Sequence, residues 1–133
     1  MLPNSTGFWA LLISVSMLAL FSSACLESHA DARLSKSDEE MAKRVILNNA
    51  CGSCHTLQAR GLNLTGKIGP DLTEQAHRNR SPQWLQGQLT NPVSIPDHEV
   101  VPGFEGKQKL MPKFNRTSQR ELNAVIEFLR SLN

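Results

Sequence analysis

The start of the chain differs from the rest in its pattern of polar and apolar positions. Residues 8–26 carry no charged side chain and are mostly apolar, and the first charge is Glu27. A stretch of this length is close to the ~20 residues that a membrane-spanning helix needs, and it also has the character of the apolar region of a secretory signal. Residues 22–24 and 28–30 both fit the small-x-Ala pattern of a cleavage site, whereas the lack of Lys or Arg before Phe8 is unusual for a signal.

This stretch divides the 133-residue chain into three parts. We predict an export signal or membrane anchor over residues 1–30, a polar linker over residues 31–36 and one domain over residues 37–133. Cys25 is either removed with the signal or becomes the lipid-bearing first residue of a lipoprotein, although residues 22–24 lack the Leu-like residue typical of such a site. We therefore expect an exported protein, in the periplasm or on the outer face of the cytoplasmic membrane.

Helical periodicity begins after the linker. Ser37-Asp38-Glu39-Glu40 has the Ser-x-x-Glu pattern of an N-terminal capping box. Apolar residues then recur at spacings of three and four, which predicts a helix that ends near Asn49. These apolar residues are Met41, Ala42, Val45, Ile46 and Leu47.

Two further helices are predicted by their caps. Ser81 and Pro82 suit the N-cap and the first helical position of a short helix, which Asn91-Pro92 would end. Ser118 and Glu121 form a second capping box. The apolar face that follows it consists of Leu122, Val125, Ile126, Leu129 and Leu132.

Glycine and proline punctuate the chain between these helices. Residues 56–73 and 92–112 are rich in both, which predicts loops. The second loop is long for a compact domain, and such loops usually have a function. No alternating run predicts a strand, so the expected fold class is all-α with long ordered loops.

Charge and composition narrow the function. The chain has 14 basic and 12 acidic side chains, with no basic run, which argues against binding to nucleic acid. Aromatic residues make up only 5% of the chain and Tyr is absent. A domain of about 100 residues buries only roughly 60–65% of its unfolded surface, so a bound macrocycle would help to fill such a core.

The segment Cys51-Gly52-Ser53-Cys54-His55 carries the most specific chemistry. Cys-x-x-Cys-His is the attachment motif for c-type haem, in which two thioethers fix the porphyrin and the next residue offers its imidazole to the iron. A redox dithiol would require strands that alternate with helices, and a zinc site would require a second ligand pair. We therefore predict one covalent haem c, held by Cys51 and Cys54 and ligated by His55.

Met111 is the candidate for the sixth iron ligand. It is the one methionine downstream of His55, and it lies in a loop just before Pro112, which would stiffen the backbone. A thioether favours ferrous iron, so His/Met ligation raises the reduction potential. Met111 as a simple core filler is the alternative, and His77 and His98 are rival ligands that we expect to lie at the surface.

Residues 37–133 resemble a class I cytochrome c, most closely the small bacterial type that includes cytochrome domains associated with terminal oxidases. The matching features occur in the family's order: a helix before Cys51–His55, Ile68-Gly69-Pro70-Asp71-Leu72, Ser81-Pro82-Gln83-Trp84-Leu85, Met111-Pro112-Lys113-Phe114, and a capped C-terminal helix.

The resemblance implies further roles. Its fold packs the N- and C-terminal helices around the haem. Pro70 resembles the residue whose carbonyl accepts the Nδ1–H of the axial histidine, which would orient the ring of His55. Trp84 resembles an indole that hydrogen-bonds a haem propionate, with core packing as the alternative.

With both axial positions occupied, no substrate reaches the iron, so we expect a one-electron carrier of a respiratory or related chain and no enzymatic activity. Expected partners are a donor reductase and an acceptor oxidase or reductase, and the carrier would be a monomer. A haem subunit of a membrane redox complex is the alternative, and a haem sensor or peroxidase would require Met111 to dissociate. The residues that could form a basic rim for docking, or ordinary solvated charge, are Lys67, Arg78, Arg80, Lys107, Lys109, Lys113 and Arg116.

Overall fold

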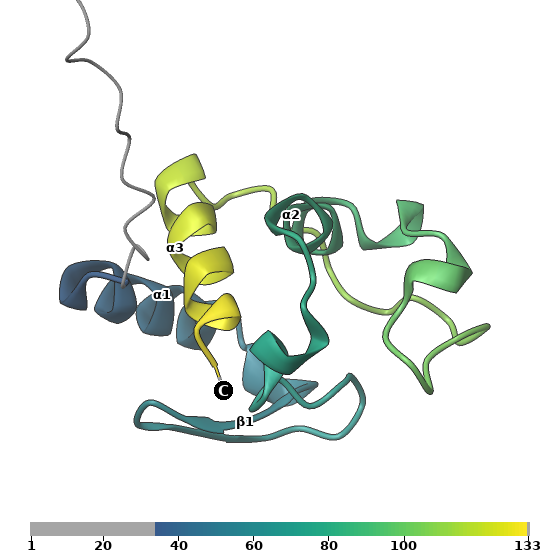
Figure 1. Ribbon diagram of the computed structural model, residues 1–133, viewed down its shortest axis with the longest axis horizontal. Coiled ribbons are helices and arrows are strands. Elements are labelled where there is room, and N and C mark those ends of the chain that lie inside the picture. Colours follow the sequence, from purple (N-terminus) through teal and green to yellow (C-terminus); the bar gives the residue numbers. More distant parts are fainter. Residues whose placement is uncertain (1–33, 133) are drawn as a thin grey trace, which may run out of the picture. The chain divides into compact units, whose positions relative to one another are not determined.

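Three α-helices and one short β-hairpin make up the regular structure of residues 34–132, the part of the chain that this computed structural model describes. The helices are α1 (Lys36–Asn48), α2 (Pro82–Thr90) and α3 (Gln119–Arg130), and the strands are β1 (Thr56–Ala59) and β2 (Leu62–Thr65), as Figure 1 shows. The predicted export signal or anchor, with Cys25, lies outside the described residues. No helix within the described part is long and apolar enough to cross a membrane.

Helix α1 begins earlier than its sequence pattern predicted. Its N-cap is Ser35, whose Oγ accepts the backbone N–H of Asp38 at 3.1 Å. The capping box predicted at Ser37 is therefore wrong, because Ser35 occupies the extended conformation that a cap requires. Ala42, Val45 and Ile46 are buried as expected, whereas Leu47 is 55% exposed and does not belong to the core face.

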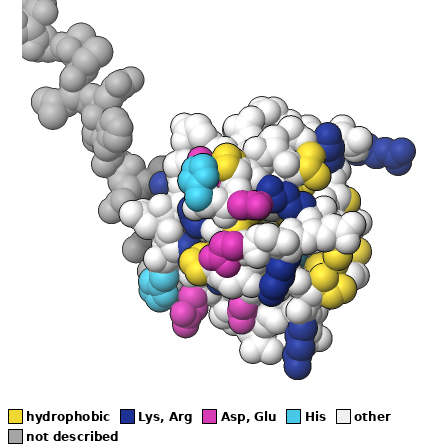
Figure 2. All heavy atoms as spheres, turned by 90° about the vertical axis from the view of Figure 1, so that its right-hand side faces the viewer, with side chains coloured by type: hydrophobic (Ala, Val, Ile, Leu, Met, Phe, Trp, Pro, Cys, Tyr) yellow, Lys and Arg dark blue, Asp and Glu magenta, His cyan; other side chains and the backbone are white. Residues whose placement is uncertain are grey.

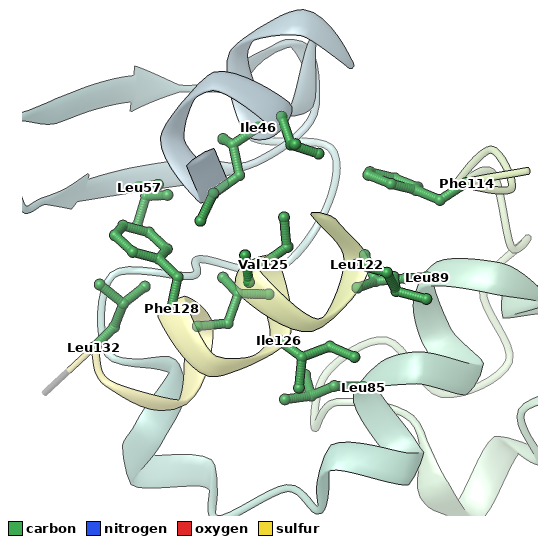
Figure 3. Packing of buried hydrophobic residues seen from close by; sticks show 14 of the residues in the cluster. Ile46, Leu57, Leu85, Leu89, Phe114, Leu122, Val125, Ile126, Phe128 and Leu132 are labelled. Carbon is green, nitrogen blue, oxygen red and sulfur yellow. The ribbon is translucent and has the colours of Figure 1, made fainter. Parts of the chain in front are cut away.

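Helix α3 packs against α1 to form the main core. The predicted capping box is confirmed, since the side chain of Ser118 accepts the N–H of Glu121 and the Glu121 carboxylate accepts the N–H of Ser118. The whole predicted apolar face is buried, together with Phe128, which is fully enclosed. Figure 3 shows Ile46 of α1 directed toward Val125 of α3. Burying an aliphatic or aromatic side chain of this size contributes about 1.5–3 kcal/mol.

The β-hairpin corrects the all-α prediction to a mainly helical fold. Its strands are antiparallel, with Thr56 opposite Thr65 and Ala59 opposite Leu62. Arg60 and Gly61 form the two-residue connection, and both have positive φ, 52° and 81°, as a type I′ turn requires. The strands escaped the sequence analysis because each has only four residues, too few to establish an alternating pattern.

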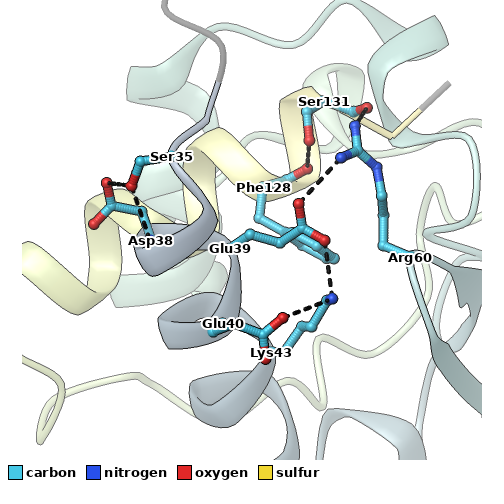
Figure 4. A network of polar contacts seen from close by, with 8 residues as sticks. All are labelled: Ser35, Asp38, Glu39, Glu40, Lys43, Arg60, Phe128 and Ser131. Atoms are coloured by element: carbon cyan, nitrogen blue, oxygen red, sulfur yellow. Dashed lines mark hydrogen bonds and ion pairs between the residues drawn. The ribbon is translucent and has the colours of Figure 1, made fainter.

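The hairpin turn is tied to both terminal helices by polar contacts (Figure 4). Arg60 contacts Glu39 of α1 at 3.1 Å and donates to the carbonyl of Ser131, just after α3, at 3.3 Å. Lys43 pairs with Glu39 at 2.9 Å. The contact with Lys43 is the main cause that holds the pKa of the Glu39 carboxyl below its usual value, and Arg60 lowers this pKa further. The network therefore joins three elements that are distant in sequence.

Helix α2 agrees with its predicted caps. The Oγ of Ser81 accepts the N–H of Trp84, Pro82 is the first helical residue, and Asn91 is the C-cap that follows the last helical residue, Thr90. Leu85 and Leu89 are buried against α3 (Figure 3). The segment between α2 and α3 forms only two short 3₁₀ turns, η3 (Pro92–Ser94) and η4 (Asp97–Glu99), and is otherwise irregular, as expected.

Candidate functional site

A cavity of about 540 Å³ lies between the helices and the two long loops. Its walls include every residue that the sequence analysis assigned to the site: Cys51, Cys54, His55, Pro70, Trp84 and Met111. Helices α1, α2 and α3 supply apolar side chains to it, among them Ile46, Leu85, Leu89, Val125 and Leu129. Ligand cavities of this size and apolar character bury most of the surface of a bound molecule.

The two cysteines and the histidine come from one turn. Ala50 has left-handed φ of 52°, which directs the chain from α1 into the 3₁₀ turn η1 (Cys51–Ser53). The carbonyl of Cys51 then accepts the N–H of His55 at 2.9 Å. Both sulfurs are free thiols and half-buried in the cavity wall. One turn therefore presents two thiols and an imidazole to the same cavity.

The environment of the Cys51 thiol argues against a role of Cys51 and Cys54 as a redox dithiol. Burial raises the pKa of Cys51 to about 11, because desolvation disfavours the thiolate. Redox-active Cys-x-x-Cys motifs instead lower the pKa of a cysteine to make it nucleophilic. The environment of Cys51 suits a neutral thiol or a thioether better than a reactive thiolate.

His55 is oriented by a backbone carbonyl. Its Nδ1 lies 2.7 Å from the carbonyl oxygen of Pro70, the contact that the family resemblance implied. Since a carbonyl can only accept, Nδ1 carries the proton and donates it, which leaves the lone pair of Nε2 available to a metal. The same donor would make the ring a stronger ligand.

Two glycines of the segment 56–73 shape the site, although the sequence analysis gave neither of them a role of its own. A Cβ at Gly69 would lie 2.5 Å from Cε1 of His55, and a Cβ at Gly66 would lie 2.5 Å from the carbonyl carbon of Cys54. The backbone of this loop packs directly on the motif, with Gly69 N–H donating to Cys54 O at 2.8 Å. Gly69 thus leaves room for the imidazole, a role that required three-dimensional contacts to recognise.

Met111 lies in the cavity wall on a segment attached to α2. Its sulfur accepts a hydrogen bond from Nε2 of Gln88 at 3.5 Å. The N–H of Phe114 donates to the carbonyl of Leu89, the next residue of α2, at 2.9 Å. Gln88 was not singled out from the sequence, because a single glutamine on a helix carries no distinctive signal.

Trp84 lines the cavity but already has a hydrogen-bond partner. Its indole N–H donates to the carbonyl of Glu99 at 3.1 Å. Arg80 stacks on the same ring at 4.6 Å and donates to the carbonyl of Val100 at 3.1 Å. Trp84 and Arg80 therefore hold the loop after α2. The propionate bond stays a prediction, and it would require the indole to exchange the Glu99 carbonyl for the propionate.

The rival ligands lie away from the cavity. The side chains of His77 and His98 are 63% and 80% exposed, and neither lines the cavity wall. Their nearest acidic neighbours are Glu74 at 3.5 Å and Glu99 at 3.6 Å. Both are surface histidines, as expected.

The basic residues considered for a docking rim lie in different environments. Arg80 and Lys109 are engaged by neighbouring carbonyls, and Arg78 donates to the side chain of Gln75. Lys67, Lys113 and Arg116 are exposed. On the face that carries the loop after α2, Figure 2 shows basic side chains interspersed with acidic ones. Ordinary solvated charge therefore describes that face better than a continuous basic patch.

Comparison with known proteins agrees with this geometry. The Cytochrome c family model matches residues 40–133, which include the whole cavity wall. Searches of curated proteins and of solved structures returned no match. Haem c, which the family attaches covalently, fits the two thiols, the oriented imidazole and the apolar walls. The chain belongs to the cytochrome c family and is a haem-binding electron carrier.

Proposed function

We propose that this protein is a one-electron carrier of a respiratory or related chain, with a single haem c ligated by His55 and Met111. One observation carries the proposal: the thiols of Cys51 and Cys54, the imidazole of His55 and the sulfur of Met111 all line one apolar cavity. Chemistry of the two thiols alone would not require an imidazole and a thioether in the same cavity.

When bound, haem c supplies an iron that changes its charge by one electron. Cys51 and Cys54 would anchor it, and His55 is held in position for ligation by the Pro70 carbonyl at 2.7 Å. Met111 would add a soft, neutral ligand, which favours the reduced state. With His55 and Met111 both as ligands, no site would remain open for a substrate, and the activity would be transfer of electrons rather than enzymatic catalysis.

The apolar side chains around the cavity support rapid transfer. Ile46, Leu85 and Val125 exclude water from its interior wall, so little solvent must reorient when the charge of the site changes. Ile68 and Leu110 border the same cavity and are each 61% exposed. These two residues offer an apolar edge at which a donor reductase or an acceptor oxidase or reductase approaches, in the small contact typical of redox partners.

The proposal includes export of the carrier from the cytoplasm. The apolar residues 8–26 deliver the carrier to the periplasm or hold it at the outer face of the cytoplasmic membrane. The partners are therefore redox proteins of that compartment. Lys67 and Lys113 are exposed and would attract acidic groups on such a partner, which makes association weaken with salt.

Absorption spectroscopy of the ferric protein tests the ligation. A weak far-red band reports a bond from sulfur to ferric iron. Met111→Leu should abolish this band, whereas Met41→Leu is the matched control, because Met41 packs against the core and does not line the cavity. A band that persists in Met111→Leu would refute Met111 as the ligand.

A further inference from the structure

A second, smaller cavity adjoins the large one between the 3₁₀ turn η2 (Gln75–Arg78), helix α2 and the end of α3. Its volume is about 80 Å³, which is more than one ordered water requires. Gln75 and Leu85 line both cavities, so a single layer of side chains separates them. We call the smaller one the arginine cavity, and its lining residues are Gln75, Ala76, Asn79, Arg80, Leu85 and Arg130.

Arg80 brings a positive charge and an unpaired donor to this cavity. Its Nε is fully buried and has no hydrogen-bond partner among the described residues. Its guanidinium is held in place by stacking on Trp84 at 4.6 Å and by donation from Nη2 to the carbonyl of Val100 at 3.1 Å. None of the ion pairs within residues 34–132 includes Arg80. A bound anion would accept the Nε–H and balance this charge.

Gln75 and Arg130 add further donors to the same wall. Gln75 is buried, and its Oε1 accepts from Nη1 of Arg78 at 2.5 Å, which leaves Nε2 with two N–H groups to donate. Arg130 uses Nη1 to contact the Glu127 carboxylate at 3.0 Å and is 43% exposed. No acidic side chain is among the lining residues. A wall of this kind suits an acceptor-only ligand, and guanidinium groups match oxyanions in both charge and geometry.

We propose that the arginine cavity binds a small inorganic oxyanion and that the bound charge lowers the reduction potential of the carrier. The second part rests on the proposed function, because it requires a haem in the large cavity. A negative charge just beyond Gln75 and Leu85 stabilises ferric iron more than ferrous iron. By linkage, the ferric protein binds the anion more tightly than the ferrous protein by the same factor.

Calorimetric titration of the haem-loaded protein with inorganic phosphate at constant ionic strength tests the site. The wild-type protein should bind one phosphate, and Arg130→Gln should weaken its affinity about tenfold, since it removes a charged donor. Arg120→Gln is the matched control, because it removes the same charge from α3 at a side chain that is 73% exposed and does not line the cavity. It should keep the wild-type affinity. Failure of the wild-type protein to bind, or equal affinities of the two variants, would overturn the site.

Arg80→Lys tests the buried donor separately from the charge. The substitution keeps a cation near Trp84 and removes the Nε–H and the planar guanidinium, so phosphate affinity should fall about tenfold while circular dichroism stays unchanged. Wild-type affinity in this variant would overturn the role of Arg80. If Arg80→Lys fails to fold, the comparison of Arg130→Gln with Arg120→Gln decides the site.

Redox titration with and without saturating phosphate tests the coupling. At a fixed solution potential, phosphate should raise the ratio of oxidised to reduced wild-type protein about twofold, which corresponds to a potential about 18 mV lower at 59 mV per tenfold for one electron. Arg130→Gln should respond less at the same phosphate concentration. Phosphate binding without a change in potential would refute the coupling. A missing far-red band would instead refute ligation by Met111, and the calorimetric result for the arginine cavity would stand.

Discussion

The α1–α3 helix pair is held by interlocking apolar side chains, whereas the two cavity loops, residues 66–73 and 92–112, are held mainly by hydrogen bonds to carbonyl oxygens. In the helix pair, Phe128 and Val125 are almost fully enclosed by neighbouring side chains. In the loops, the N–H of Gly69 donates to Cys54 O, and the indole of Trp84 donates to Glu99 O.

This difference assigns separate tasks to the two regions. Side-chain packing joins α1 and α3 through residues such as Phe128, which is fully enclosed and does not line the cavity. The cavity loops bury few side chains of their own and present backbone and polar groups to the site. A bound group that fills the cavity therefore has more influence on the loops than on the helices, and mutations should separate along the same line.

The largest effect is expected from the core of the helix pair. Phe128→Ala should lower the free energy of unfolding by about 3–5 kcal/mol, through lost burial and the cavity left behind. Leu47→Ala is the control on α1, where the side chain is exposed, and it should change stability by less than about 0.5 kcal/mol. Equal effects of the two substitutions in denaturant titrations would contradict the assignment of the core.

The next effect concerns the loop beneath the histidine. In Gly69→Ala the added Cβ would lie 2.5 Å from the His55 ring, so the imidazole must move from the Pro70 carbonyl. We expect an altered far-red band in the ferric spectrum with the helix core intact by circular dichroism. Gly103→Ala is the control: its Cβ meets open space, but φ is +86°, so it reports backbone strain of about 1 kcal/mol alone. An unaltered spectrum of Gly69→Ala would contradict this prediction, because it would show that the His55 imidazole accommodates the added Cβ without moving.

A smaller effect is expected at the loop after α2. Trp84→Phe removes the donor to Glu99 O and keeps most of the ring, which should cost about 1 kcal/mol. Hydrogen exchange should accelerate in residues 93–110 and remain unchanged in α1 and α3. A shift in reduction potential without faster exchange would instead favour the propionate role of Trp84.

The smallest effect is the pH dependence of the ion pairs around Arg60. Lys43 and Arg60 lower the pKa of Glu39 below the usual value of a glutamate. The stabilisation is therefore complete above that value and is lost as pH falls through the lowered pKa. Glu39→Gln should lower the free energy of unfolding by about 0.3–1 kcal/mol at pH 7. In denaturant titrations, the decrease of this free energy between pH 7 and pH 3 should also be smaller in the variant than in the wild-type protein. An unchanged pH profile would indicate that the network contributes nothing.

Local sequence signals predicted the helices well and the turns poorly. Ser81-Pro82 and the Ser118–Glu121 box defined α2 and α3 because cap chemistry is local. At α1, Ser35 and Ser37 each precede an acidic residue by three positions, and the pattern alone could not choose between them. The hairpin was missed although Arg60-Gly61 could have indicated a two-residue turn.

The candidate site shows the same division between local and distant information. Cys51, Cys54 and His55 form a contiguous motif, so their place in one cavity wall followed directly from the sequence. Pro70 was assigned only through family resemblance, and its contact with His55 spans fifteen positions. The partners of the Met111 sulfur and of the His55 ring depend on how distant segments pack, which no spacing in the sequence records.

The central claim is the covalent attachment of one haem through Cys51 and Cys54, and intact-mass measurement after acid extraction tests it most directly. The protein, expressed with a competent haem-ligation machinery, should retain the mass of one haem on the polypeptide chain. Cys51→Ala and Cys54→Ala together should lose that mass entirely. A wild-type chain that yields its bare polypeptide mass, with the haem in the extract, would contradict the account.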